Sequence, residues 1–249
     1  MAQRGSRVVE QLDWTGVERV LVVSAHPDDV DFGWAGSVAA MTDAGIEVVY
    51  CIVTDGDAGG SETGIPRAEM AARRHDEQRA AAAIVGVHDV HFLGYPDGRL
   101  EVSLGLRRDL SRLIRDVRPH RVMCQSPERI LDRIYASHPD HLAAGEATIC
   151  AVYPDARNRW AHPELTDEGW EPWTVDEIWL GVGSSGFTHY IDITNSVDRK
   201  IEALLSHKSQ LPDPDATETM VRGWTAATAK TVGLPAGCFA EAVRVVNTR

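Results

Sequence analysis

Two short segments, far apart along the chain, gather histidine and aspartate side chains that could hold a metal ion. They are Ala25-His26-Pro27-Asp28-Asp29 and His138-Pro139-Asp140-His141. The adjacent carboxylates of Asp28 and Asp29 repel each other, and a divalent cation would relieve that repulsion. His138 and His141 are spaced so that on a helical turn they face the same way. Two imidazoles and one carboxylate would leave a coordination position open, as in catalytic zinc sites, and the chemistry expected there is metal-assisted hydrolysis.

Each segment alone has a simpler interpretation. Asp28 or Asp29 could be the N-cap of a following helix, and Ser137 could cap the helix that the second segment opens. The same ligand types also suit a non-haem iron site of two histidines and one carboxylate, with His26-x-Asp28 and a distant histidine as ligands. Such iron sites commonly lie on all-β folds, so the order of strands and helices bears on the choice.

The elements around both segments alternate between strand and helix. We predict strands at 17–25, 46–54, 90–93 and 121–125, and helices at 33–44, 66–86, 102–117 and 140–151. Alternation of this kind, with strands that are almost continuously apolar, predicts an α/β fold: a Rossmann-like three-layer sandwich with a mostly parallel sheet and helices on both faces. Each segment directly follows a strand or its loop, where open parallel sheets bind ligands. The turn after the first strand has no G-x-G-x-x-G, which disfavours a dinucleotide site.

The pattern changes after about residue 153. We expect a loop over 153–176, strands at 177–182, 188–193 and 239–246, and a helix at 197–207. The expectation is a single domain over residues 1–249 whose C-terminal third is decorated.

Aromatic and histidine side chains of this C-terminal third have two interpretations. Trp160, Trp170 and Trp173 could form a lip that stacks on a sugar ring, or they could anchor an ordinary loop, and the second interpretation is favoured. Other histidines have no partner at ligand spacing, and we expect them to be solvated or capping groups: His162, His189 and His207.

Composition excludes several classes of partner. The chain has 249 residues and a formal net charge of −12, which argues against nucleic acid and anionic membranes because both repel negative charge. The four cysteines include no C-x-x-C pair, so we expect no thiolate metal site and a reducing compartment. The N-terminus lacks the long apolar stretch of a signal peptide, and a cytoplasmic protein is expected.

Together, the two segments resemble the PIG-L/LmbE-like family of zinc-dependent N-acetylglucosaminyl deacetylases, whose pattern is an A-H-P-D-D box after the first strand and an H-x-x-H box near the middle. The similarity extends over roughly residues 18–210 and includes 54–56 (TDG), 74–77 (RHDE), 93–98 (LGYPDG) and 192–194 (DIT). The resemblance implies a hydrolase that removes an N-acetyl or other N-acyl group from a small molecule containing an amino sugar. Two alternatives stay open: an amidase acting on a thiol conjugate or natural-product glycoside, and a non-catalytic sugar-binding relative.

The resemblance also implies roles for individual residues. The metal ligands would be His26, Asp29 and His141. Zn²⁺ is the ion implied, and Fe²⁺ is possible because both ions accept these ligands. Asp28 would be the general base that takes a proton from the attacking water and passes it to the leaving amine. His138, as an imidazolium, would stabilise the oxyanion, and Asp140 would orient His138.

Substrate contacts and departures from the family pattern complete the comparison. Arg74 and Asp97 resemble the sugar-contacting pair, although a structural ion pair is an equal alternative.

The A-H-P-D-D box of the family usually continues with Glu. Here the next acid is Asp31, one place later, which puts packing on the substrate side in doubt. Some members carry a tyrosine where Ala136 stands, and the neighbouring Tyr135 is a candidate to replace it.

Overall fold

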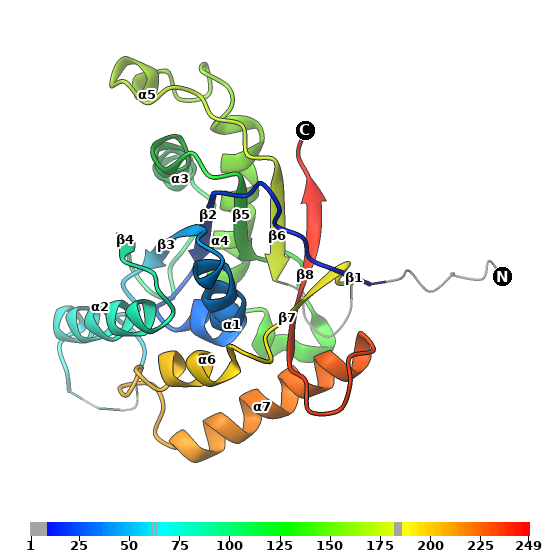
Figure 1. Ribbon diagram of the computed structural model, residues 1–249. Coiled ribbons are helices and arrows are strands. Elements are labelled where there is room, and N and C mark those ends of the chain that lie inside the picture. The colour runs from blue at the N-terminus through cyan, green and yellow to red at the C-terminus, as the bar shows by residue number, and fades with distance from the viewer. Residues whose placement is uncertain (1–8, 61, 63, 182–185) are drawn as a thin grey trace.

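The computed structural model describes residues 9–249 except 61, 63 and 182–185, without the side chains of 133, 135 and 136. The strands form one sheet of eight with the order β1-β7-β8-β6-β5-β2-β3-β4 (Figure 1). They are β1 (Glu10–Gln11), β2 (Arg19–Ser24), β3 (Glu47–Thr54), β4 (Asp89–Tyr95), β5 (Arg121–Gln125), β6 (Glu177–Gly181), β7 (His189–Asp192) and β8 (Ala240–Asn247). The longer helices are α1 (Asp29–Asp43), α2 (Arg67–Ile84), α3 (Leu104–Val117), α4 (Pro139–Cys150), α6 (Val197–Leu204) and α7 (Pro214–Thr231). Short helical segments are η1 (Leu131–Ala136), η2 (Ala151–Asp155) and α5 (Pro163–Asp167).

Strand pairing confirms the predicted, mostly parallel sheet. β2 pairs in parallel with β3 and β5, β4 extends the sheet beyond β3, and β6 extends it beyond β5. Only β8 runs antiparallel to its neighbours among the described strands, between β6 and β7. Because β6, β7 and β8 all come from the C-terminal third, that third is part of the same sheet, which favours the predicted single domain.

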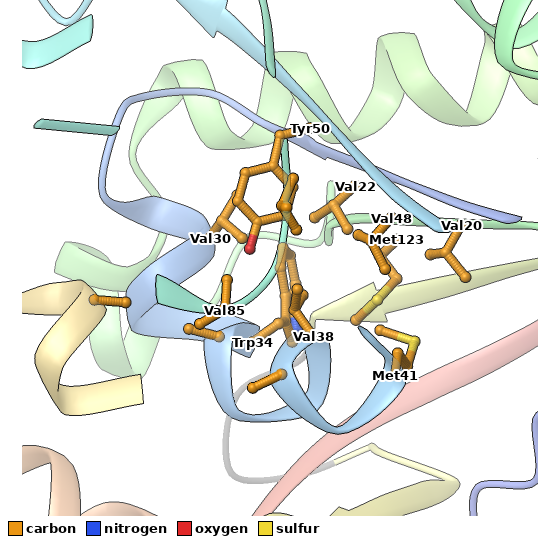
Figure 2. Close-up of a cluster of buried hydrophobic side chains, with 14 of the residues drawn as sticks. Val20, Val22, Val30, Trp34, Val38, Met41, Val48, Tyr50, Val85 and Met123 are labelled. Carbon is orange, nitrogen blue, oxygen red and sulfur yellow. The ribbon is translucent and has the colours of Figure 1, made fainter. Parts of the chain in front are cut away.

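Side chains of the central strands alternate between two cores, one on each face of the sheet. Val20 and Val22 of β2 lie in a cluster with residues of α1, α2 and α6, whereas Leu21 and Val23 lie in a cluster with residues of α3 and α4. This alternation follows from the two-residue repeat of a strand. Helices therefore cover both faces and give the predicted three layers. Figure 2 shows the first cluster, in which Trp34 and other α1 side chains meet the β2 and β3 side chains.

Most predicted elements are confirmed to within a few residues, and the differences have local causes. α1 begins at Asp29 rather than at 33, because Asp28 is its N-cap residue. α7, which has 18 residues, was not predicted. Its threonines and Gly223 blur the apolar repeat, although Asp213 caps it through a bond from the Ala216 N–H and Pro214 occupies its first turn. No helix among the described residues combines the length and apolar character that a membrane crossing requires.

Candidate active site

The two histidine and aspartate segments meet because the strands before them are neighbours. β2 leads into the first segment and β5 into the second, and Val23 lies opposite Cys124 in their parallel pairing. The side chain of Gln125, the last residue of β5, accepts a hydrogen bond of 2.9 Å from the backbone N–H of Ala25. The carboxyl ends of both strands thus open on the same edge of the sheet, where ligands bind in folds of this class.

The three side chains predicted to ligate a metal converge at this edge. His26 Nδ1 lies 3.2 Å from His141 Nε2 and 3.2 Å from Asp29 Oδ2, and His141 Nε2 lies 3.1 Å from Asp29 Oδ1. Ligand atoms of a tetrahedral zinc ion, at bond lengths of about 2.0–2.1 Å, are separated by about 3.3 Å. The spacing therefore fits one divalent ion. Two other groupings, His26 with His138 and His141, and His26 with Asp97 and Asp140, also lie within 4.8 Å.

Carboxylates surround His26 and favour positive charge at this point. Burial disfavours the charged form of His26, but hydrogen bonds to Asp140, Asp29 and Asp97 outweigh it and raise the pKa of His26 to about 12. Burial also opposes the charge of Asp29, but the neighbouring His141 and His26 hold the pKa of Asp29 well below its usual value. A site that draws positive charge this strongly suits a divalent cation.

Asp28 lies beside this cluster in a strained backbone conformation. Its φ of 91° is in the left-handed region, which costs a non-glycine residue about 1–3 kcal/mol. Its side chain accepts a bond of 3.1 Å from Arg74 Nη2 and makes no helix-capping bond, so the simple N-cap interpretation does not explain it. Burial raises the pKa of Asp28 to about 6, although Arg74 opposes the shift. A carboxyl group that titrates near neutral pH suits proton transfer.

His138 and Asp140 are both at the site, but their contacts differ from the prediction. His138, not Ser137, is the N-cap of α4, and its Nδ1 accepts a bond of 3.2 Å from the backbone N–H of Asp140. The bond accepted by Nδ1 favours the tautomer with its proton on Nε2, and burial lowers the pKa of His138, so both observations favour a neutral donor over the predicted imidazolium.

The carboxylate of Asp140 contacts His26 instead of His138. Its Oδ2 lies 3.1 Å from His26 Nε2 and accepts a bond of 2.7 Å from the Gly98 N–H, while Oδ1 accepts one from Leu100. Carboxylates in this position fix the ring orientation of a metal-binding histidine. The prediction that Asp140 orients His138 is therefore corrected: the backbone N–H of Asp140 does so, and its side chain orients His26.

Arg74 and Asp97 line the same hollow, but most of the Arg74 guanidinium is already bonded to protein. Arg74 is 3% exposed, and it donates to the carbonyl oxygens of Gly56 and Pro27 as well as to Asp28. Its Nη1 lies 3.8 Å from Asp97 Oδ2. The two predicted roles, sugar contact and structural ion pair, are both compatible with this position.

The side chains described above border a cavity of about 330 Å³. Its lining residues are His26, Asp28, Ala58, Gly59, Arg74, Asp97, His138 and His141. A larger hollow of about 450 Å³ between α6 and α7 shares no residue with it. The predicted contribution of Tyr135 concerns a side chain outside the described residues.

Comparisons with known proteins agree with this geometry. The sequence profile of PIG-L, described as GlcNAc-PI de-N-acetylase, matches residues 21–152. The diacetylchitobiose deacetylase of Thermococcus kodakarensis is 31% identical over 201 residues, which cover 79% of this chain and 72% of that protein. The chain belongs to the PIG-L family.

Further relatives have similar names. A probable N-acetyl-alpha-D-glucosaminyl L-malate deacetylase 2 of Bacillus anthracis is 30% identical over 77% of this chain and 80% of its own length. Among solved structures, N,N'-diacetylchitobiose deacetylase from Pyrococcus horikoshii, complexed with an inhibitor, superimposes with a TM-score of 0.86 at 27% identity, covering 94% of this chain and 85% of that one. The hydratase GalB, at 21% identity and a TM-score of 0.77, shares the fold alone.

The tryptophan-rich loop after α4 lies away from this PIG-L site. Trp173 Nε1 donates a bond of 2.8 Å to the carbonyl of Pro119, and the Asp176 N–H donates to that of His120. Both acceptors precede β5, so the loop lies at the amino end of the strand, and Figure 1 shows α5 at the extremity opposite α6 and α7. The favoured interpretation, a loop anchored by its tryptophans, agrees with these contacts, and the sugar-binding lip is wrong.

Three supporting residues of the site were missed or misread in the sequence. Gln78 is fully buried and bonds to the backbone of Asp28, and no sequence signal distinguished it in its helix. His207 is also fully buried and bonds to Asp31, so the expectation of a solvated or capping group was wrong for this residue, whereas His162, although buried, is the N-cap residue of α5. Asp31 itself points into this buried contact rather than toward substrate.

Proposed function

We propose that this PIG-L protein is a metal-dependent hydrolase that removes an N-acetyl or other N-acyl group from a small molecule containing an amino sugar. The observation that carries the proposal is the convergence of His26, Asp29 and His141 with a further carboxylate, Asp28, at the wall of the same cavity. The deacetylase names of its relatives support the reaction class.

In this proposal His26, Asp29 and His141 hold the ion, and Asp140 fixes the ring of His26. Zn²⁺ fits the ligand types and spacing, and Fe²⁺ accepts the same ligands. A divalent ion bound there acidifies a water molecule and polarises the carbonyl group of the substrate amide. The other groups required for the reaction are supplied by the chain itself.

Asp28 and His138 have different roles: Asp28 transfers the proton, and His138 stabilises the negative charge. Asp28 takes a proton from the water whose oxygen bonds to the amide carbon, and returns it to the nitrogen as the carbon–nitrogen bond breaks. The products are a carboxylic acid and a free amine. His138, neutral and protonated at Nε2, donates a hydrogen bond to the amide oxygen as negative charge develops on it.

The size of the cavity is compatible with a small-molecule substrate. Its volume of about 330 Å³ is at the low end for ligand pockets and suits one sugar-sized group with its acyl substituent. Asp97 and the remaining donor capacity of Arg74 are proposed to bind sugar hydroxyls. The net charge of −12 agrees with a substrate that is neither nucleic acid nor anionic membrane.

A screen for amine release tests the proposal against its alternatives. Metal-loaded protein is incubated with N-acetyl and other N-acyl amino sugars, their disaccharides and glycosides, thiol conjugates and simple amides. Amine release from the amino sugars is expected. Turnover confined to thiol conjugates or natural-product glycosides would favour the amidase alternative. Saturable sugar binding without any amine release would contradict the proposal and favour a binding protein, which has no use for the strained Asp28.

A further inference from the structure

A chain of buried polar side chains extends from Asp28 to the C-terminal third of the molecule. Gln78 Oε1 accepts a bond of 2.8 Å from the Asp28 N–H, and Gln78 Nε2 donates one of 2.8 Å to Asp31 Oδ2. His207 Nε2 lies 2.8 Å from that same carboxylate oxygen. Gln78, Asp31 and His207 are all 0% exposed. They come from α2, from the first turn of α1 and from the segment after α6.

The peptide group between Pro27 and Asp28 is held on both sides by α2. Its carbonyl oxygen accepts a hydrogen bond from Arg74, and its N–H donates to Gln78, one helical turn farther along. Arg74 and Gln78 therefore fix the orientation of this peptide plane between them. Rotation of the plane would let Asp28 relax from its φ of 91° to a negative φ, and any part of that change not offset by ψ of Pro27 would displace its carboxylate relative to the cavity.

The partners of Gln78 also fix which way its amide points. A carboxylate can only accept and a backbone N–H can only donate, so Asp31 takes the NH₂ group and leaves the oxygen for Asp28. His207 holds Asp31 from the other side, and both side chains are fully buried, so the carboxylate has one preferred position.

We propose that Gln78 is a positioning residue, backed by Asp31 and His207, that maintains the left-handed conformation of Asp28 and so aims its carboxylate at the reacting water. The role as stated rests on the proposed function, because it assigns Asp28 as the base. The conformational part of the proposal does not depend on any activity.

Gln78→Met tests the proposal because it keeps the length of the side chain and removes both hydrogen bonds. We expect kcat to fall about 10- to 100-fold, since small misplacements of a reacting group have effects of that order. KM and metal content should stay close to wild type, because the predicted ligands and sugar contacts are retained. A change confined to KM, with kcat unchanged, would overturn the proposal.

Ser196→Ala is the matched control. It removes a different buried hydrogen bond to α1, from Ser196 Oγ to the Gly36 carbonyl at 2.7 Å. The hydrogen bonds of Gln78 with Asp28 and Asp31 stay intact. The Tm of this variant should fall, with kcat unchanged. Equal losses of kcat in Gln78→Met and Ser196→Ala would reduce Gln78 to a general stability role and contradict the proposal.

A double-mutant cycle and a crystal structure complete the test. His207→Gln should lower kcat in the wild-type background and have little further effect in Gln78→Met, whereas additive losses would contradict a shared path. The crystal structure of Gln78→Met, or of Gln78→Leu if the first variant does not fold, should show Asp28 at negative φ. An Asp28 that keeps its positive φ would overturn the inference. If the wild-type protein releases no amine, the proposed function fails, and this structural result still decides the inference.

Discussion

The two ends of the sheet both bury charged side chains, but they balance the charges differently. At the amino end, Arg107 makes two bonds of 2.8 Å to the carboxylate of Asp155. Arg115 there, 3% exposed, donates to backbone carbonyl oxygens of the tryptophan-rich loop, among them those of Ala156, Asn158 and Trp170. Arg107 is thus paired with a carboxylate and Arg115 with several carbonyl dipoles, and the result is a clamped loop.

At the carboxyl end the charges do not cancel. Asp29, Asp97 and Asp140 all contact the ring of His26, and Asp28 stands beside them in a strained conformation. Burial of charge alone therefore does not mark a functional site, since the amino end has it too. An excess of one sign, together with backbone strain, distinguishes the end of the sheet where we place the chemistry.

Asp28→Asn should have the largest effect among substitutions that spare the metal. The amide cannot accept the proton of the attacking water, and removal of a general base typically lowers kcat about 10²–10⁴-fold. Steady-state kinetics and elemental analysis of the same preparation measure kcat and metal content. Full activity in this variant would remove Asp28 from the mechanism.

His138→Ala should have a somewhat smaller effect. Loss of one donor to a developing oxyanion typically lowers kcat about 10²–10³-fold, and the metal should be retained because His138 is not among the three proposed ligands. The kinetic constants separate the alternatives: a change confined to KM would indicate a binding role and count against the oxyanion assignment.

Arg115→Met tests the amino end, and we expect its effect on stability rather than on turnover. The loop carbonyls lose a charged donor, and the free energy of unfolding should fall by about 3 kcal/mol, measured by urea denaturation. The kcat of the folded enzyme should stay within about twofold of wild type, since no step of the mechanism uses this end. A large loss of kcat at unchanged stability would mean that the two ends are functionally coupled.

Trp160→Ala should have the smallest effect. The side chain is 78% exposed on the same loop, so the free energy of unfolding should change by no more than about 0.5 kcal/mol. KM for the amino-sugar substrate should be unchanged. A clear rise in KM would indicate that the tryptophans contact substrate, and it would contradict the distinction between the amino and carboxyl ends of the sheet.

The sheet and the meeting of the two boxes could be predicted because local signals specify them. The strands are apolar throughout, as strands covered on both faces must be, and each box comes after a strand of the parallel sheet. α7 was missed because its threonines weaken the apolar repeat that normally identifies a helix.

The finer chemistry of the site depends on contacts that spacing does not encode. The proton position on His138 follows from one backbone N–H, and the partner of Asp140 follows from which ring its carboxylate meets after folding. His207 and Asp31 are distant in sequence, so neither could be recognised as buried until the fold brought them together.

Metal content measured by elemental analysis after dialysis tests the central claim most directly. Wild-type protein loaded with Zn²⁺ should retain about one ion per chain, and His141→Ala should lose most of it, because two ligands hold a zinc ion far less firmly than three. A His141→Ala variant that keeps the full metal complement, or a wild-type protein that binds none, would contradict the assignment of His26, Asp29 and His141 as one metal site.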